Sequence, residues 1–218
     1  MFYINFTFEI LALAAGLVLF YKIKPVVLRL LIPLLLITVV NEGLAYYKVY
    51  TAAGLNKTHF YIGFFLLEML IFYCIYRSWF NQERKNKKLA SLIFLCSVLL
   101  SIFTLFMWGY NKLNPFFLNV VCLCMIGFGF LYYRFVFRIN KVFLFRKDPM
   151  FWLSTGVVFV NFLHFLFVNA VFIDSFRNNN SSAEVFQVLN TIGNIFYYGC
   201  IIIAFICSSR YPRQVGTW

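Results

Sequence analysis

The segment Tyr61–Tyr76, "YIGFFLLEMLIFYCIY", decides the fold class of this chain. Its sixteen residues are almost all apolar, and one carboxylate, Glu68, lies near the middle. Barrel strands would be about ten residues long and alternate in polarity, which this run does not. Extended to Thr58–Trp79, it is long enough to cross about 30 Å of hydrocarbon as a helix. The segment therefore predicts a transmembrane helix that carries an acid close to the bilayer midplane.

The rest of the sequence repeats this pattern. Of its 218 residues, 63% are hydrophobic and 12% are charged, whereas a soluble domain is about half apolar and a quarter charged. Short connections separate the apolar segments, with no linker that would mark a second domain. The sequence predicts an all-α, polytopic membrane protein with one domain, residues 1–218, and seven transmembrane helices: Phe2–Tyr21, Pro25–Tyr47, Thr58–Trp79, Leu89–Trp108, Pro115–Phe137, Met150–Ile173 and Val185–Ser208.

The basic residues predict the orientation of these helices. Fifteen of the nineteen Lys and Arg residues fall at one set of helix ends, and four fall at the other: Lys48, Lys57, Lys112 and Arg177. The positive-inside rule then places the N-terminus outside and the C-terminus in the cytoplasm. The net charge of +12 is explained by this bias and by contact with anionic lipids, so no nucleic-acid partner is expected.

Two further features concern processing and redox state. The first segment contains Glu9 and has no basic region before it, so it is expected to be a retained helix and not a cleaved leader. All six cysteines lie inside predicted helices, which gives no support for a disulfide framework. Cys122 and Cys124 are two residues apart, on nearly opposite helix faces, which is unsuited to a shared metal site.

A charged side chain near the midplane costs roughly 3 kcal/mol or more if it faces lipid, so Glu68 is expected to point into the bundle or to stay protonated. Counting depth at about 1.5 Å per residue identifies the polar residues that share the outer half of the membrane with it. The predicted ligand-binding cluster is Glu68, Glu42, Asn41, Glu9, Asn161, His164, Asn190 and Asn194. On the sixth helix, Asn161, His164 and Asn169 are expected to share a face.

Two interpretations of this cluster stay open. It lines a water-filled cavity that opens outward and ends near Glu68, or it is a dry network whose hydrogen bonds of about 0.6 to 2 kcal/mol tie the helices together. The inner halves of the helices are poorer in polar residues. A proton relay or a polar lane across the whole membrane therefore lacks inner partners.

Sequence motifs for catalysis are weak. Only two histidines occur, without a zinc-binding spacing, no G-x-S-x-G is present, and the seventh helix has no lysine. No metal or other cofactor is predicted, and an enzyme is not favoured. Two small-xxx-small pairs, Ala12 with Gly16 and Ser97 with Ser101, arise often by chance and predict no particular helix contact.

One inner connection, Arg134–Asp148, interleaves cations with Phe and Val. Arg134, Arg138 and Lys141 are spaced as a basic stripe on a helix. Together with Arg84 and Lys85 they predict a docking surface for a cytoplasmic partner, and the alternative is a helix end that lies in the headgroup layer. Asp148 and Pro149 then begin the sixth helix as cap and first residue.

Four stretches carry a resemblance: "VVNEGLAYY" (39–47), "FLLEML" (65–70), "KDPMFWLSTGVVF" (147–159) and "LNTIGNIFYYG" (189–199). They resemble small uncharacterised seven-helix inner-membrane proteins of bacteria, similar to membrane sensor regions associated with histidine kinases. No kinase domain is expected after the last helix, so the resemblance implies a signal passed to a separate protein. The matching positions are Asn41, Glu42, Glu68, Asp148, Pro149, Trp152, Ser154, Thr155, Gly156, Asn190 and Tyr198.

The sequence thus predicts a sensor or signalling accessory of the bacterial inner membrane that binds a small or lipidic ligand in the outer half. The lipid bilayer is its expected surroundings, and a cytoplasmic signalling protein is its expected partner. One alternative is an oligomeric pore-forming or membrane-perturbing accessory, for example in bacterial defence, which would work as a homo-oligomer. A small transporter is a further alternative.

Overall fold

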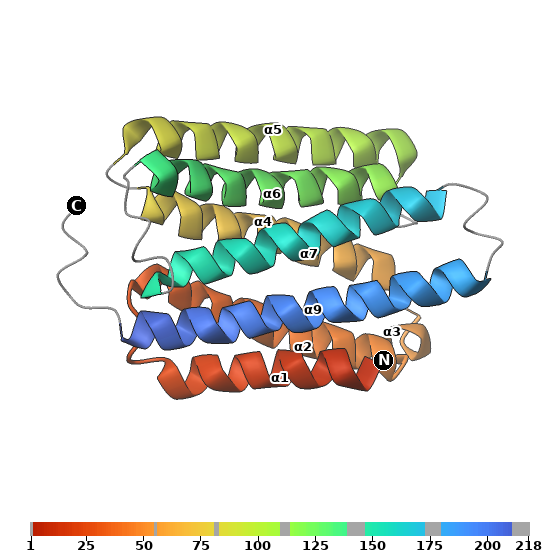
Figure 1. Cartoon of the computed structure of the whole chain (residues 1–218). Helices are drawn as coiled ribbons and strands as arrows, with labels where there is room; N and C mark the ends of the chain where they lie inside the picture. Colours follow the sequence, from red (N-terminus) through yellow and green to blue (C-terminus); the bar gives the residue numbers. More distant parts are fainter. Residues whose placement is uncertain are drawn as a thin grey trace.

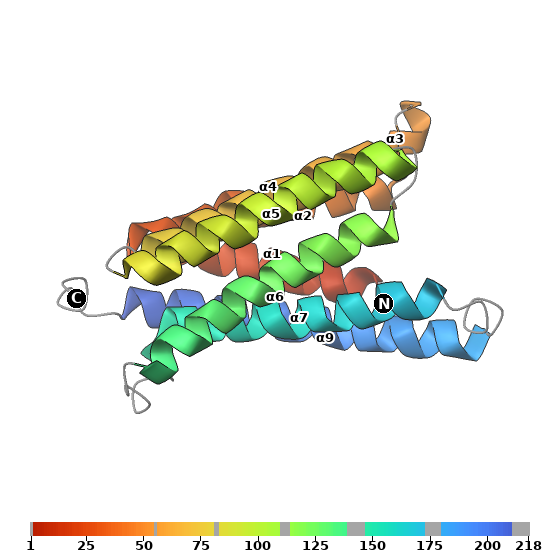
Figure 2. The ribbon, with the colours of Figure 1, turned by 90° about the horizontal axis from the view of Figure 1, so that it is seen from above.

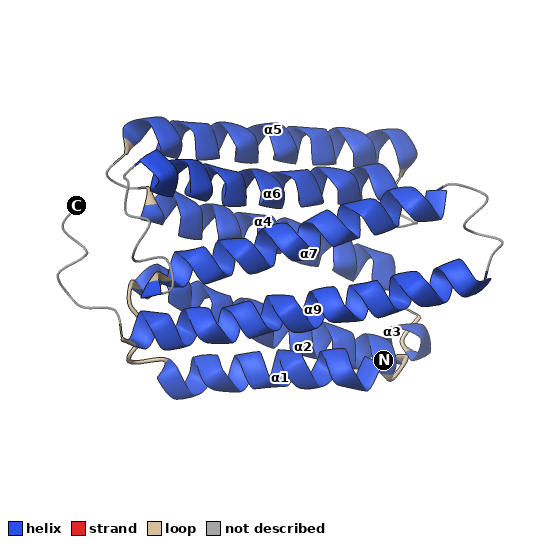
Figure 3. Cartoon of the chain, in the orientation of Figure 1, coloured by secondary structure: helices blue, strands red, loops and turns tan. Residues whose placement is uncertain are grey.

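A computed structural model describes residues 2–54, 56–80, 83–109, 114–138, 147–172 and 180–210. These residues are almost entirely helical, and no strand occurs among them (Figure 3). The elements are α1 (Phe2–Leu19), the 3-10 helix η1 (Val26–Leu30), α2 (Leu31–Tyr46), α3 (Val49–Ala52), α4 (Lys57–Trp79), α5 (Arg84–Trp108), α6 (Pro115–Arg138), α7 (Pro149–Phe172) and α9 (Asn180–Ser209).

The long helices lie roughly along one common direction, from left to right in Figure 1. Six of them form a closed ring, because α1 packs on α2, α2 on α4, α4 on α6, α6 on α7, α7 on α9, and α9 again on α1. Helix α5 lies outside this ring, against α4 and α6. Seen from above, α4 and α5 cover one side, α7 and α9 cover the other, and α6 crosses between them (Figure 2).

The two ends of the bundle differ in charge. Because successive helices alternate in direction, one end holds α3 with Lys48 and Lys57, and we call it the α3 end. The opposite end, here the basic end, holds the other described cations: Lys22, Lys24, Arg29, Arg77, Arg84, Lys85, Lys87, Lys88, Arg134, Arg138, Lys147 and Arg210. The charge asymmetry expected from the sequence is therefore an asymmetry between two physical ends.

Short polar side chains and one glycine set the helix boundaries. The Asn56 side chain accepts a hydrogen bond from the Thr58 amide (3.0 Å) at the start of α4, and Asn114 accepts one from the Phe116 amide (2.9 Å) before α6. The predicted cap at Asp148 is confirmed, since its carboxylate accepts from the Met150 amide (2.9 Å). Gly109 ends α5 with a φ of 76°, a conformation that glycine adopts without strain.

Within the described residues, six helices are long and apolar enough to cross a membrane, and Tyr3–Leu19 is a shorter apolar helix. These properties are those of a helical, multi-pass membrane protein. The predicted boundaries differ from the observed ones at several ends. The first helix stops at Leu19 because the chain turns there, the second begins as η1, and α5 and α9 start five residues before the predicted starts at Leu89 and Val185.

Helix α5 has its polar side inward. Its buried side chains are small or polar, namely Asn86, Ala90, Ser97, Ser101 and Thr104. Its exposed side chains are large and apolar, among them Leu92, Leu95, Leu99, Phe103 and Phe106. Small residues let helix backbones approach closely, and in lipid the bulky apolar surface faces outward at no cost. The Ser97 and Ser101 pair thus lies at a helix contact.

Helix α1 makes a similar close contact. A Cβ atom built on Gly16 would lie 2.9 Å from Ile32 Cγ1 of α2 and 3.0 Å from the Phe205 ring of α9. Ala12, one turn earlier, is fully buried. The Ala12 and Gly16 pair therefore seats α1 in the groove between its two neighbours, which closes the ring.

A fully buried part of the core fills the ring toward the basic end. It consists of fully buried, mostly aromatic side chains: Leu28, Phe72, Ile75, Tyr76, Phe80, Phe128, Tyr132, Met150, Leu153, Ala204 and Phe205. We call these residues the floor. Tyr76 and Phe128 stack at its centre, with ring centroids 5.5 Å apart.

Candidate functional site

A cavity of about 370 Å³ lies inside the ring, on the side of the floor that faces the α3 end. All six ring helices contribute to its wall, and α5 contributes none of the described lining residues. The polar lining residues are Asn5, Glu9, Thr38, Glu42, Tyr61, Glu68, Cys122, Asn161, His164, Asn190, Asn194, Tyr197 and Tyr198. The apolar ones include Phe6, Leu34, Leu35, Phe64, Phe65, Leu118, Val121, Val160, Phe167 and Ile201. This is a mixed polar and aromatic wall, typical of small-molecule sites.

Seven of the eight predicted ligand-binding residues line this cavity: Glu9, Glu42, Glu68, Asn161, His164, Asn190 and Asn194. The eighth, Asn41, does not. It is buried (7% exposed), and its side-chain oxygen accepts a hydrogen bond from the Tyr50 hydroxyl (2.6 Å). Asn41 thereby ties α2 to α3. Whether the other seven residues bind a ligand stays a prediction.

The three carboxyl groups have different partners. Glu42 accepts a hydrogen bond from the Tyr61 hydroxyl (3.1 Å). One oxygen of Glu9 lies 3.4 Å from the Tyr198 hydroxyl, and the other is buried without a hydrogen-bond partner in the described ranges. The Glu68 carboxyl has no hydrogen-bond partner among the residues that the structure describes. Tyr198 lies within electrostatic range of all three acids, so they belong to one site.

The amide side chains and His164 form hydrogen bonds of two kinds, some between helices and some within one helix. His164 Nε2 and Asn190 Oδ1 lie 2.8 Å apart and join α7 to α9 across the wall. Asn161 donates to the Val157 carbonyl of its own helix (2.9 Å). Asn169 pairs with Asn119 of α6 through two 3.1 Å hydrogen bonds and does not line the cavity. The expected face shared with Asn161 is therefore wrong for Asn169, because eight residues make about 2.2 turns.

Between the cavity and the basic end, hydroxyl groups form hydrogen bonds that connect neighbouring helices. Tyr76 of α4 donates to Ser154 of α7 (2.9 Å) within the floor. Tyr132 of α6 donates to Asp148 (2.7 Å) at the basic end, and Tyr133 and Thr155 lie 2.9 Å apart. Burial raises the pKa of Asp148, and its hydrogen bonds from Tyr132 and from backbone amides oppose that rise. These contacts make the floor a connected layer between cavity and basic end.

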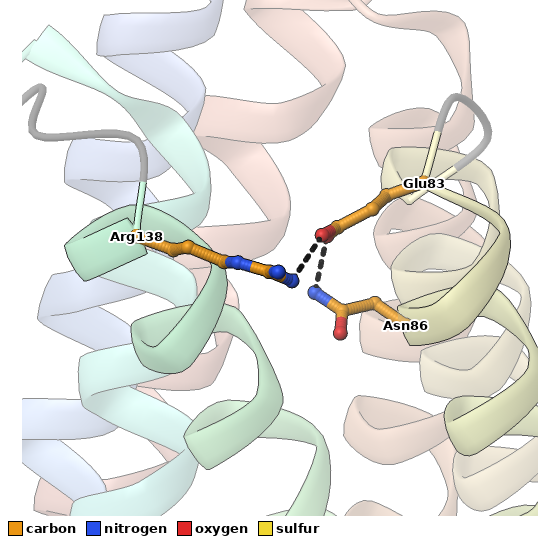
Figure 4. A network of polar contacts seen from close by, with 3 residues as sticks. All are labelled: Glu83, Asn86 and Arg138. Atoms are coloured by element: carbon orange, nitrogen blue, oxygen red, sulfur yellow. Dashed lines mark hydrogen bonds and ion pairs between the residues drawn. The ribbon is translucent and has the colours of Figure 1, made fainter.

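The predicted docking residues lie at the basic end. Arg134, Arg84 and Lys85 are exposed there, and Lys141 lies outside the described residues. Arg138 instead has a partner of its own. Figure 4 shows its guanidinium donating to Glu83 (3.2 Å), whose other oxygen accepts from Asn86 (2.6 Å). This contact links the end of α6 to the start of α5, and as an exposed ion pair it contributes at most about 1 kcal/mol.

Sequence reasoning missed several lining residues. Asn5 lies one turn before Glu9, so its i, i+4 spacing placed it on the same face. Tyr61 and Tyr197 also line the cavity. The Tyr61 ring supplies apolar wall while its hydroxyl donates to Glu42, which is the usual arrangement for a buried tyrosine.

Among the described residues, no group of three or more His, Cys, Asp or Glu side chains is placed to hold a metal ion. The fold and the cavity together define a helical membrane protein with a central polar and aromatic pocket. A scan of protein-family models finds no match, and neither do searches of curated proteins and of solved structures. The resemblance to small seven-helix membrane proteins of bacteria stays a prediction.

Proposed function

We propose that this chain is a sensor of the bacterial cytoplasmic membrane, with seven crossings and its N-terminus outside. A small or lipidic ligand enters the cavity from the α3 end, and the basic end passes the signal to a separate cytoplasmic protein. The observation that carries this proposal is the combination of a central cavity with a floor of fully buried side chains.

The floor favours binding over passage. A transporter or pore needs a route on both sides of its site. Here the side chains between the cavity and the basic end are fully buried and mostly aromatic, and buried cores are packed as densely as organic crystals. A ligand that enters from the α3 end therefore stops at the floor, which supports a receptor and not a conduit.

The same floor supplies a route for the signal. Tyr198 contacts Glu9 in the cavity wall, and Ile201 of the same helix is still in the lining while Ala204 and Phe205 belong to the floor. A ligand that pairs with Glu68 or Glu9 shifts α4 or α1 relative to α9. Because packed interfaces respond by moving as units, the displacement reaches the Tyr76 and Ser154 contact and then the basic end.

The proposed orientation predicts which ends are accessible. In a chain without its six native cysteines, Lys48→Cys at the α3 end should react with a membrane-impermeant maleimide in intact cells. Lys88→Cys at the basic end should react only after permeabilisation. Both lysines are exposed, so the pair is matched in accessibility. The reverse labelling pattern would contradict the orientation.

The proposed access route predicts the reactivity of Cys122. This thiol lines the cavity, whereas Cys124, two residues on, does not and contacts Ser97 of α5. With only one of the two present, the neutral reagent methyl methanethiosulfonate should modify Cys122 at least tenfold faster than Cys124. The measurement is the modification rate by mass spectrometry in lipid nanodiscs. Equal slow rates would mean that no ligand reaches the cavity.

A further inference from the structure

The unpaired polar atoms of the cavity are hydrogen-bond acceptors. Glu9 is only 6% exposed, yet among the described residues one of its carboxyl oxygens has no partner, and neither has the buried side-chain oxygen of Asn5 one turn away. Glu68, on α4, adds a carboxyl that likewise has no hydrogen bond to this part of the chain. An unmet buried polar atom costs about 1 to 3 kcal/mol, so the site calls for donors from a ligand.

The charge of the cavity wall also favours a ligand that donates hydrogen bonds. Three carboxyl groups line it, and the described lining includes no Lys or Arg. Lys57 at the α3 end interacts with Glu42, and His164 is hydrogen-bonded to Asn190. Among the described residues, Glu9 and Glu68 are left without a cationic neighbour inside the ring. A buried carboxyl group either stays protonated or is paired with a counter-charge, and a cationic ligand would supply that counter-charge.

The wall also fits the body of such a ligand. Phe6, Phe64, Phe65 and Phe167 surround the space together with Tyr197 and Tyr198. Aromatic faces attract cations and also pack against apolar groups. At about 30 Å³ for each water-sized group, a cavity of about 370 Å³ holds on the order of a dozen non-hydrogen atoms.

We propose that the ligand is an organic ammonium ion whose N–H groups donate to Glu9 and Asn5 and whose apolar body packs against the phenyl wall toward Glu68. This inference rests on the proposed function, because it names the chemical class that the sensor binds. A quaternary ammonium would satisfy the charge but would leave the two acceptors unmet, so a primary ammonium is preferred. The head group of an aminophospholipid and a free amine share this chemistry.

Three probes with one body and different heads test the inference: 4-phenylbutylammonium, 4-phenylbutan-1-ol and 5-phenylvalerate. Each is titrated by calorimetry into the full-length protein in phosphatidylcholine nanodiscs. The ammonium should bind saturably and at least tenfold more tightly than the alcohol or the carboxylate. Adding phosphatidylethanolamine to the nanodiscs should weaken the apparent affinity for the ammonium if the lipid is the source, and leave it unchanged if a free amine is.

Variants locate the effect. Glu9→Gln should weaken ammonium binding at least tenfold and leave the weak binding of the alcohol unchanged. Glu83→Gln, which removes a carboxyl far from the cavity, should change neither. Unfolding midpoints without ligand check that each variant is folded, and Asn5→Leu, which removes the other proposed acceptor, replaces Glu9→Gln if the latter does not fold.

The outcomes distinguish a failure of the ammonium assignment from a failure of the proposed sensor function. Equal affinity for ammonium and alcohol would overturn the ammonium assignment, and so would unchanged ammonium binding by Glu9→Gln. If the ammonium does not bind while Cys122 is reactive, the cavity stands and the ligand class is wrong. If no probe binds and Cys122 is unreactive, both the ligand class and the proposed sensor fail.

Discussion

Replacing Phe128 by alanine is expected to lower the free energy of unfolding by about 3 kcal/mol or more, the usual cost of removing a buried phenyl ring. Phe128 is fully buried in the floor, where it stacks on Tyr76 and lies 6.4 Å from the Tyr73 ring, measured between centroids. Removing the Phe128 ring leaves a void in the floor that neighbouring side chains on rigid helices cannot fill. The measurement is equilibrium unfolding by sodium dodecyl sulfate in mixed micelles, followed by circular dichroism.

Phe130→Ala is the matched control, since it is the same substitution two residues further along α6. Phe130 is 60% exposed on the outside of the bundle. Its removal exchanges contact with acyl chains or detergent for similar contact, so the expected change is under about 1 kcal/mol. Comparable losses of unfolding free energy in the two variants would mean that the floor is not tightly packed. The argument that the floor closes the cavity toward the basic end would then fail.

Gly129→Ala is expected to destabilise the protein by about 1 to 3 kcal/mol, the range for overfilling a packed contact. A Cβ atom at this position would overlap Cγ2 of Val158 on α7 and lie 3.5 Å from the Ser154 carbonyl. Valine on a helix has one strongly preferred rotamer, so the methyl group cannot swing aside and α6 must move away from α7. Unfolding in the same micelles measures the effect.

Gly127→Ala serves as its control on the same helix. Its added methyl group would meet only Ile93 at 3.6 Å, an ordinary contact, and alanine is the better helix former by about 1 kcal/mol. A neutral or slightly stabilising result is expected. If Gly127→Ala were as damaging as Gly129→Ala, the effect would come from the helix backbone and not from the contact between α6 and α7.

The fold class was predictable because hydrocarbon leaves the backbone few choices. Without water, a spanning segment must satisfy its own amides, so a long apolar run is a helix whatever its other residues are. Segment lengths therefore located α4, α6 and α7 to within one residue at each described end. The start of α5 was harder to locate, because Arg84, Lys85 and Lys88 lower the hydropathy there although the helix has already begun.

Depth along a helix was also predictable, and direction around it was not. Counting residues predicted Glu68 near the midplane and Glu9 and Asn194 in the outer half of the membrane, and the cavity contains all three. Asn41 and Glu42 were predicted in that half as well, but successive residues on a helix point about 100° apart. Glu42 faces the cavity and Asn41 faces Tyr50. Only the order of helices around the ring decides between such neighbours, and that order comes from close contacts such as the one at Gly129.

Helix α5, with serine and threonine turned inward and leucine and phenylalanine turned outward, is an inside-out version of a water-soluble helix. Its outer side chains touch neither the pocket nor the floor, so their identity is set by the solvent alone. A version of this protein for study in plain buffer could therefore have Leu92, Leu95, Leu99, Phe103 and Phe106 replaced by glutamate, lysine or glutamine. The inward-facing side of α5 would stay as it is, since it already has the small side chains that its neighbours require.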